Sequence, residues 1–195
     1  MTDTDLAVEL AAARQRVADA AGDMSRAAFD NDPRAVAGWL DSAAAAATRR
    51  EFVLPDDAEP QTLYLWMHDF EINPDRWFMT PFAMGPEQPA AEDQFDWRDS
   101  LIGDEIGSGL RVPDLTLTGM ESVQSWFEQQ AETPDQSAVE NLVVLAAFDL
   151  VARSLPHVTD VPFRVAMSRG EEWRVCVWAT PTASARVHTW QRTTG

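Results

Sequence analysis

The spacing of hydrophobic residues along the chain predicts four helices. Apolar side chains recur at helical spacing over residues 4–29, from Val36 to Ala47, from Met120 to Phe127 and from Val139 to Val151. The last segment has the strongest periodicity, so we expect a central core helix that Pro156 ends. The first two segments are rich in alanine, which favours a close αα-hairpin at the N-terminus.

Local start signals support three of these helices. Asp32-Pro33 is an N-cap followed by a proline at the first helical position, and Thr133-Pro134 repeats that arrangement. Thr118-Gly-Met-Glu121 is a capping box, in which the threonine and glutamate side chains satisfy each other's backbone N–H groups.

Strand-like alternation begins at Tyr64. The run from Tyr64 to Ile72 is apolar on both faces at first, as expected for an interior strand covered on both sides. Asn73-Pro74-Asp75-Arg76 has the residues of a type I turn, and Trp77 to Phe82 forms the return strand. Pro81 predicts an edge position or a bulge in that strand, because proline cannot donate to a sheet ladder.

A turn centred on Pro74 and Asp75 fixes the expected pairing of the two strands. It places His68 opposite Pro81, and it puts Trp66 and Trp77 on the same side of the hairpin. Core packing is the ordinary role of such tryptophans, and an aromatic slot for a carbohydrate or another flat ligand is the alternative.

The C-terminal part of the chain predicts three more strands. They lie at 161–167, 173–177 and 186–192, the last as an edge strand. The predicted fold class is α+β, with the N-terminal αα-hairpin and two further helices packed on a mostly antiparallel sheet of about five strands. We expect a helical unit at 1–50 and an α+β domain at 51–195 that carries a long acidic loop at 85–114.

Charge and composition narrow the function. The 15 basic residues are all arginine and face 32 acids, which gives a net charge of −17. This charge repels nucleic acids and anionic membranes and attracts basic proteins. The absence of lysine excludes Schiff-base catalysis and the P-loop lysine. The acidic N-terminus is not a signal peptide and no apolar run could span a bilayer, so we expect a cytoplasmic protein.

The sequence does not match the patterns of common metal and catalytic sites. Asp69-x-Glu71-x-Asn73 begins like a calcium loop, but Pro74 and Thr80 occupy the positions that need glycine and glutamate. The three histidines lack zinc-ligand spacing, and no serine-hydrolase or zinc-protease motif is present. Cys176, the single cysteine, lies in a strand-like run and is expected to be a small buried hydrophobe. We therefore expect no metal and no cofactor.

Aromatic residues among acids suggest a partner surface instead. Phe95 and Trp97 stand among acidic residues of the long loop, and aromatic anchors in an acidic rim suit a basic partner. In the alternative, the two rings only attach the loop to the core. We expect the acids of the hairpin tip to lie beside this loop and to form one negative surface with it. The candidate partner surface comprises Asp69, Glu71, Asp75, Glu92, Asp93, Phe95, Asp96, Trp97 and Asp99.

The leading hypothesis is a non-enzymatic acidic protein, monomeric or homodimeric, that binds a basic protein. At class level it resembles the small acidic α+β immunity proteins of bacterial toxin systems, and a chaperone for a secreted effector fits as well. The alternative is a small hydrolase-type enzyme with a carboxylate and histidine site, whose residues converge only in space. Its candidates are His68, Asp69, Glu71, Glu121 and His188. A third hypothesis is a structural subunit whose acidity is an adaptation to salt.

Overall fold

The computed structural model describes residues 3–53, 59–67, 77–85, 108–129, 134–169, 174–178 and 185–189. Within these ranges lie four α-helices: α1 (Leu6–Ala21), α2 (Pro33–Thr48), α4 (Glu121–Gln129) and α5 (Pro134–Ser154). Two short 3-10 helices, η1 (Gly22–Arg26) and η2 (Leu155–His157), follow α1 and α5. The strands are β1 (Asp3–Asp5), β2 (Thr62–Met67), β3 (Trp77–Met84), β4 (Ser108–Gly109), β5 (Leu115–Leu117), β6 (Arg164–Arg169), β7 (Arg174–Trp178) and β8 (Arg186–Thr189).

The strands form one sheet in the order β1-β8-β7-β6-β2-β3-β4, and β5 pairs with β3 beside β4. The neighbouring pair β2 and β6 is parallel, whereas the other pairs are antiparallel. The predicted α+β class is therefore confirmed. Four strands, β2, β3, β6 and β7, have five or more residues and make up the main part of the sheet, whereas about five strands were predicted. The expected edge strand, β8, is not at the edge, because β1 pairs with it.

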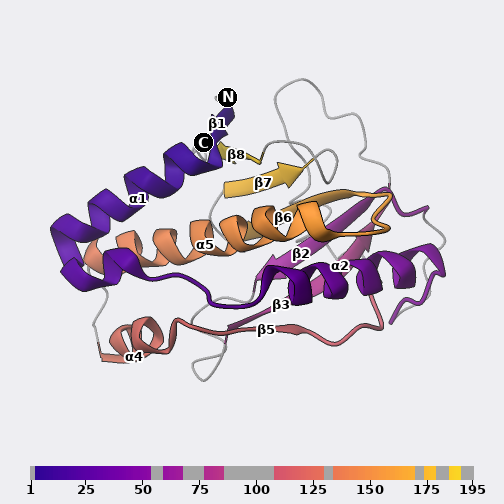
Figure 1. The fold of residues 1–195 in the computed structure, drawn as a ribbon, viewed down its shortest axis with the longest axis horizontal. Helices are drawn as coiled ribbons and strands as arrows, with labels where there is room; N and C mark the ends of the chain where they lie inside the picture. The colour runs from indigo at the N-terminus through magenta and orange to yellow at the C-terminus, as the bar shows by residue number, and fades with distance from the viewer. Residues whose placement is uncertain are drawn as a thin grey trace, which may run out of the picture.

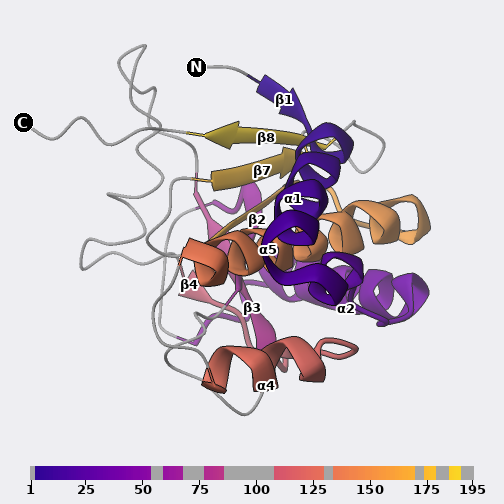
Figure 2. The same cartoon turned by 90° about the vertical axis from the view of Figure 1, so that its left-hand side faces the viewer.

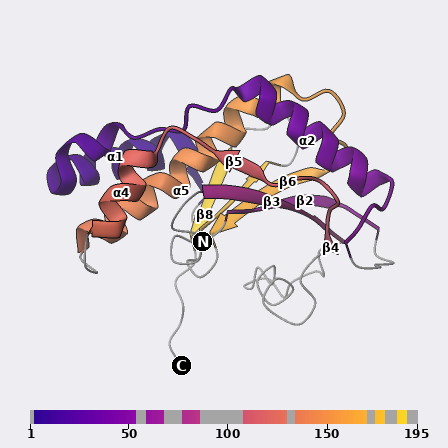
Figure 3. The same ribbon diagram turned by 90° about the horizontal axis from the view of Figure 1, so that it is seen from below.

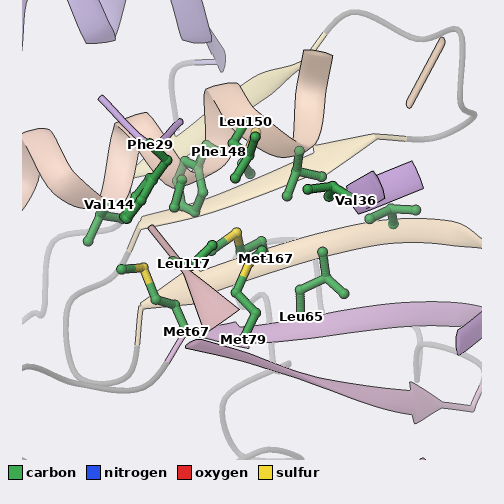
Figure 4. Close-up of a cluster of buried hydrophobic side chains, with 14 of the residues drawn as sticks. Phe29, Val36, Leu65, Met67, Met79, Leu117, Val144, Phe148, Leu150 and Met167 are labelled. Carbon is green, nitrogen blue, oxygen red and sulfur yellow. The ribbon is translucent and has the colours of Figure 1, made fainter. Parts of the chain in front are cut away.

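The helices cover one face of the sheet (Figures 1, 2 and 3). The predicted central helix is confirmed, since α5 runs across this face with Leu142, Leu145 and Phe148 fully buried. Figure 4 shows Phe148 and Leu150 of α5 above the side chains of β2, β3 and β6. Burying a side chain of this size stabilises a protein by about 1.5–3 kcal/mol, so the α5–sheet layer holds the fold together.

The two N-terminal helices do not form the close αα-hairpin that their alanines favoured. Both lie against α5, and their main contacts are with α5 rather than with each other. Ala13 and Val17 of α1 and Val36 and Leu40 of α2 are fully buried. Alanine permits close approach to any helix, so the stripe alone could not identify α5 as the partner. The buried residues of α1 and α2 belong to the same hydrophobic core as the rest of the described chain.

The β2–β3 pairing corrects the predicted register. Leu65 lies opposite Pro81 and Met67 opposite Met79, so the pairing differs by three residues from the one expected. The observed pairs are symmetric about position 73, whereas the predicted pairs were symmetric about the bond between Pro74 and Asp75. The prediction derived the register from the turn residues at 73–76, which lie outside the described residues.

Pro81 lies where β3 changes its outer partner. β5 pairs with residues 77–79, and β4 pairs with Phe82 and Ala83. Between these two short strands the missing N–H of Pro81 breaks no ladder bond, while its carbonyl accepts a hydrogen bond from the N–H of Leu110 at 3.2 Å. The prediction of an edge strand is therefore wrong for β3, which pairs with β2 on one side and with β4 and β5 on the other; Pro81 is tolerated because it lies in the gap between β5 and β4.

The predicted capping box at the start of α4 is replaced by a long-range contact. The Thr118 hydroxyl donates to Asp30 at 2.6 Å, and the Thr118 N–H donates to the Asn31 side chain at 2.9 Å. Glu121 accepts from the N–H of Gly119 at 3.1 Å instead of from Thr118. Thr118 therefore joins the β5–α4 turn to the segment before α2, a contact that no local motif predicts.

Part of the predicted loop at 85–114 belongs to the sheet. Ser108 and Gly109 form β4, and Leu110 is buried and makes an isolated bridge with Phe52. The Trp39 indole also donates to the carbonyl of Pro113 at 2.8 Å. The C-terminal residues of the predicted loop are therefore attached to the body, while residues 86–107 lie outside the described residues.

Candidate functional site

The face of the sheet opposite the helices carries a cluster of large apolar side chains. Alternation along β2 sends Leu63 and Leu65 to the helix side and Tyr64 and Trp66 to the other side. We call Tyr64, Ala166, Trp66, Phe82 and Met84 the outer-face cluster. The Phe82 ring lies 5.9 Å from that of Trp66 and 6.5 Å from that of Tyr64, centroid to centroid. Trp66, Phe82 and Met84 are only partly buried.

The aromatic slot built on Trp66 and Trp77 is contradicted, because the two side chains lie on opposite faces of the sheet. Trp77 belongs to the core beneath the helices and packs edge-on against Phe29, with ring centroids 5.9 Å apart. The error follows from the three-residue register shift, since an odd shift exchanges the faces of one strand relative to the other.

The nine residues of the predicted partner surface lie outside the described residues. These are Asp69, Glu71, Asp75, Glu92, Asp93, Phe95, Asp96, Trp97 and Asp99. The structure does describe the points where their segments leave the body. Segment 68–76 joins β2 to β3, and segment 86–107 begins after Gly85 and ends before β4. These two attachment points lie at opposite ends of β3, whose eight residues span roughly 23 Å at ~3.3 Å per residue.

Each of these acidic segments shares its end of the sheet with a second one. The Val53 N–H donates to Gly109 at 2.7 Å, and the Gln61 N–H donates to Met84 at 2.8 Å, so segment 54–58 is attached beside segment 86–107. β2 and β6 run parallel with Met67 beside Arg169, so segments 68–76 and 170–173 leave from the same end. The expected neighbours, 68–76 and 86–107, are thus attached apart. The sequence analysis missed that 86–107 is attached beside 54–58 and 68–76 beside 170–173, because these pairings follow from the strand order and not from any local pattern.

Negative charge is concentrated in the segments between the described ranges. The described ranges contain 12 arginines and 17 acids, a net charge of −5. The remaining residues contain 3 arginines and 15 acids, a net charge of −12, and the two values together give the −17 of the whole chain. Acidity is therefore a property of particular segments more than of the whole surface.

The residues of the alternative enzyme site are not brought together where the structure describes them. Glu121 opens α4, and His188 lies in β8 beside Asp3 and Val175 in register. β8 is four strand positions from β3, roughly 19 Å at ~4.8 Å per strand, and α4 follows β5 on the far side of β3. His68, Asp69 and Glu71 lie outside the described residues.

Two titratable groups of the body have shifted pKa values with structural causes. Burial raises the pKa of the Cys176 thiol far above its ordinary range, which outweighs a hydrogen bond with the backbone of Arg186. Cys176 is fully buried, so the expectation of a small buried hydrophobe is confirmed. Burial alone would raise the pKa of Asp41, but hydrogen bonds from the Asp160 N–H and the hydroxyl and N–H of Thr159 lower it below its ordinary value. Both groups have structural explanations and neither indicates a reaction.

Within the described ranges, no three His, Cys, Asp or Glu side chains are placed to hold a metal ion. In the same ranges, no helix has the length and apolar character needed to cross a membrane. No known protein family, curated protein or solved structure matches this chain.

Proposed function

We propose that this protein is a non-enzymatic, cytoplasmic binding protein whose acidic surface holds a basic protein partner. Such a protein would be an immunity or antitoxin-like protein, or a chaperone that binds a basic protein. The main observation behind the proposal is the uneven distribution of charge along the sequence, with a net −12 in the residues outside the described ranges and −5 in the residues within them. A basic partner would gain both faster association and specificity from such concentrated charge.

The attachment points of the acidic segments support a partner surface at an end of the sheet. Segments 54–58 and 86–107, attached at one end, carry nine acids and one arginine; segments 68–76 and 170–173, at the other end, carry five acids and one arginine. The first end therefore offers the stronger field, and its sequence includes Phe95 and Trp97. Aromatic residues within a charged rim are the usual energetic anchors of protein interfaces.

Paired charge-neutralising variants test which end binds. The first pair is Asp93→Asn with Asp96→Asn, and the second is Asp69→Asn with Glu71→Gln. The control pair, Asp19→Asn with Asp23→Asn, removes the same charge from exposed positions on α1 and η1. Each protein is used as bait in lysate of the source cell. The partner is a basic protein that the wild type and the control pair retain but one of the test pairs loses.

The affinity of the identified partner is then measured against salt. An exposed ion pair contributes about 0.2–1 kcal/mol, so losing two lowers the affinity by roughly 2- to 30-fold. We expect the larger loss for the pair in 86–107, and weaker binding as NaCl rises from ~50 to ~500 mM. Equal losses for all three pairs would show that only net charge matters. An affinity independent of salt would rule out electrostatic recognition.

The aromatic residues are tested separately from the charges. If Phe95 and Trp97 are interface anchors, replacing either by alanine costs at least about 2 kcal/mol of binding, which is a loss of roughly 30-fold. Val53→Ala, at an exposed residue next to segment 54–58, is the control. A lower melting temperature with unchanged affinity would mean that the rings serve the fold and not the interface.

A further inference from the structure

We draw no further inference here: the strongest candidate, the outer-face cluster around Trp66 and Phe82 on the sheet face opposite the helices, is an apolar patch for which nothing in the described part of the chain shows what covers it.

Discussion

Asp41 ties α2 to the segment that follows η2, and its replacement gives the sharpest test of the fold. Its carboxylate accepts the Thr159 N–H at 2.9 and 3.1 Å, the Thr159 hydroxyl at 2.7 Å and the Asp160 N–H at 3.1 Å. These bonds join residues 118 and 119 positions apart in the sequence. The carboxylate thus satisfies two backbone donors in a segment that carries the chain from α5 to β6.

We expect Asp41→Ala to destabilise the protein by about 1–2 kcal/mol. A hydrogen bond to a charged group contributes about 1.5–3 kcal/mol when buried, but Thr159 and Asp160 are exposed and water can partly replace the carboxylate. For a chain of this size, that loss lowers the melting temperature by roughly 2–8 °C. Thermal and urea unfolding measure it. Asp160→Asn is the matched control, because it removes a nearby charge and leaves the backbone donor in place.

The pH dependence of the same variant tests whether the ionised Asp41 carboxylate is the source of this stability. Because the pKa of Asp41 is lower in the folded than in the unfolded protein, its contribution is complete above the unfolded value of about 4 and is lost as the pH falls through the folded value. The stability difference between wild type and Asp41→Ala should therefore shrink as the pH falls below about 4. A difference that stays constant down to acid-induced unfolding, or no difference at pH 7, would refute the role assigned to the carboxylate.

Three further predictions test the backbone, the core and the charge. Gly119 has a φ of 96° and an added Cβ would lie 2.8 Å from the Asp30 backbone, so Gly119→Ala should cost about 1–3 kcal/mol in chemical unfolding. Gly38→Ala, in open space on α2, should stabilise the protein by about 0.5–1 kcal/mol. If Gly119→Ala were instead the more stable of the two variants, that result would contradict the turn geometry. Cys176 should react with a thiol reagent only at the rate of unfolding, and fast labelling of the native protein would disprove its burial. The protein should stay folded when NaCl is lowered from ~1 M to ~50 mM, as measured by circular dichroism. Unfolding at low salt would favour the hypothesis that the acidity is an adaptation to salt.

Local patterns predicted the helices and strands because those elements depend on nearby residues. The spacing from Val139 to Val151 identified α5, and Asp32-Pro33 marked the start of α2, where the Asp32 side chain accepts the Arg34 N–H at 3.0 Å. β1 was missed because three residues are too few for a pattern, and its pairing with β8 spans almost the whole chain. The parallel β2–β6 pair was missed for the same reason, since nothing local encodes it.

The candidate site was harder to predict than the fold because its geometry depends on register and topology. A turn placed on Pro74 and Asp75 shifted the register by three residues and so misassigned the face of Trp77. Sequence also suggested that segments 68–76 and 86–107 form one surface, whereas they are attached at opposite ends of β3. The charge count needed no structure, but its division between two ends of the sheet needed the strand order.

The uneven distribution of charge along the chain bears on why the protein is acidic. An adaptation to salt would place acids over the whole exposed surface, because every part of the surface must bind water and ions. The described body instead carries 12 arginines against 17 acids, and some are paired, as Arg49 is with Glu51 at 2.7 Å and Arg153 with Asp149 at 2.8 Å. Exposed pairs of this kind add little stability, and they lower the field that the body projects. The excess negative charge therefore follows a few segments attached at the ends of the sheet, which is the distribution expected if the charge serves to recognise a partner.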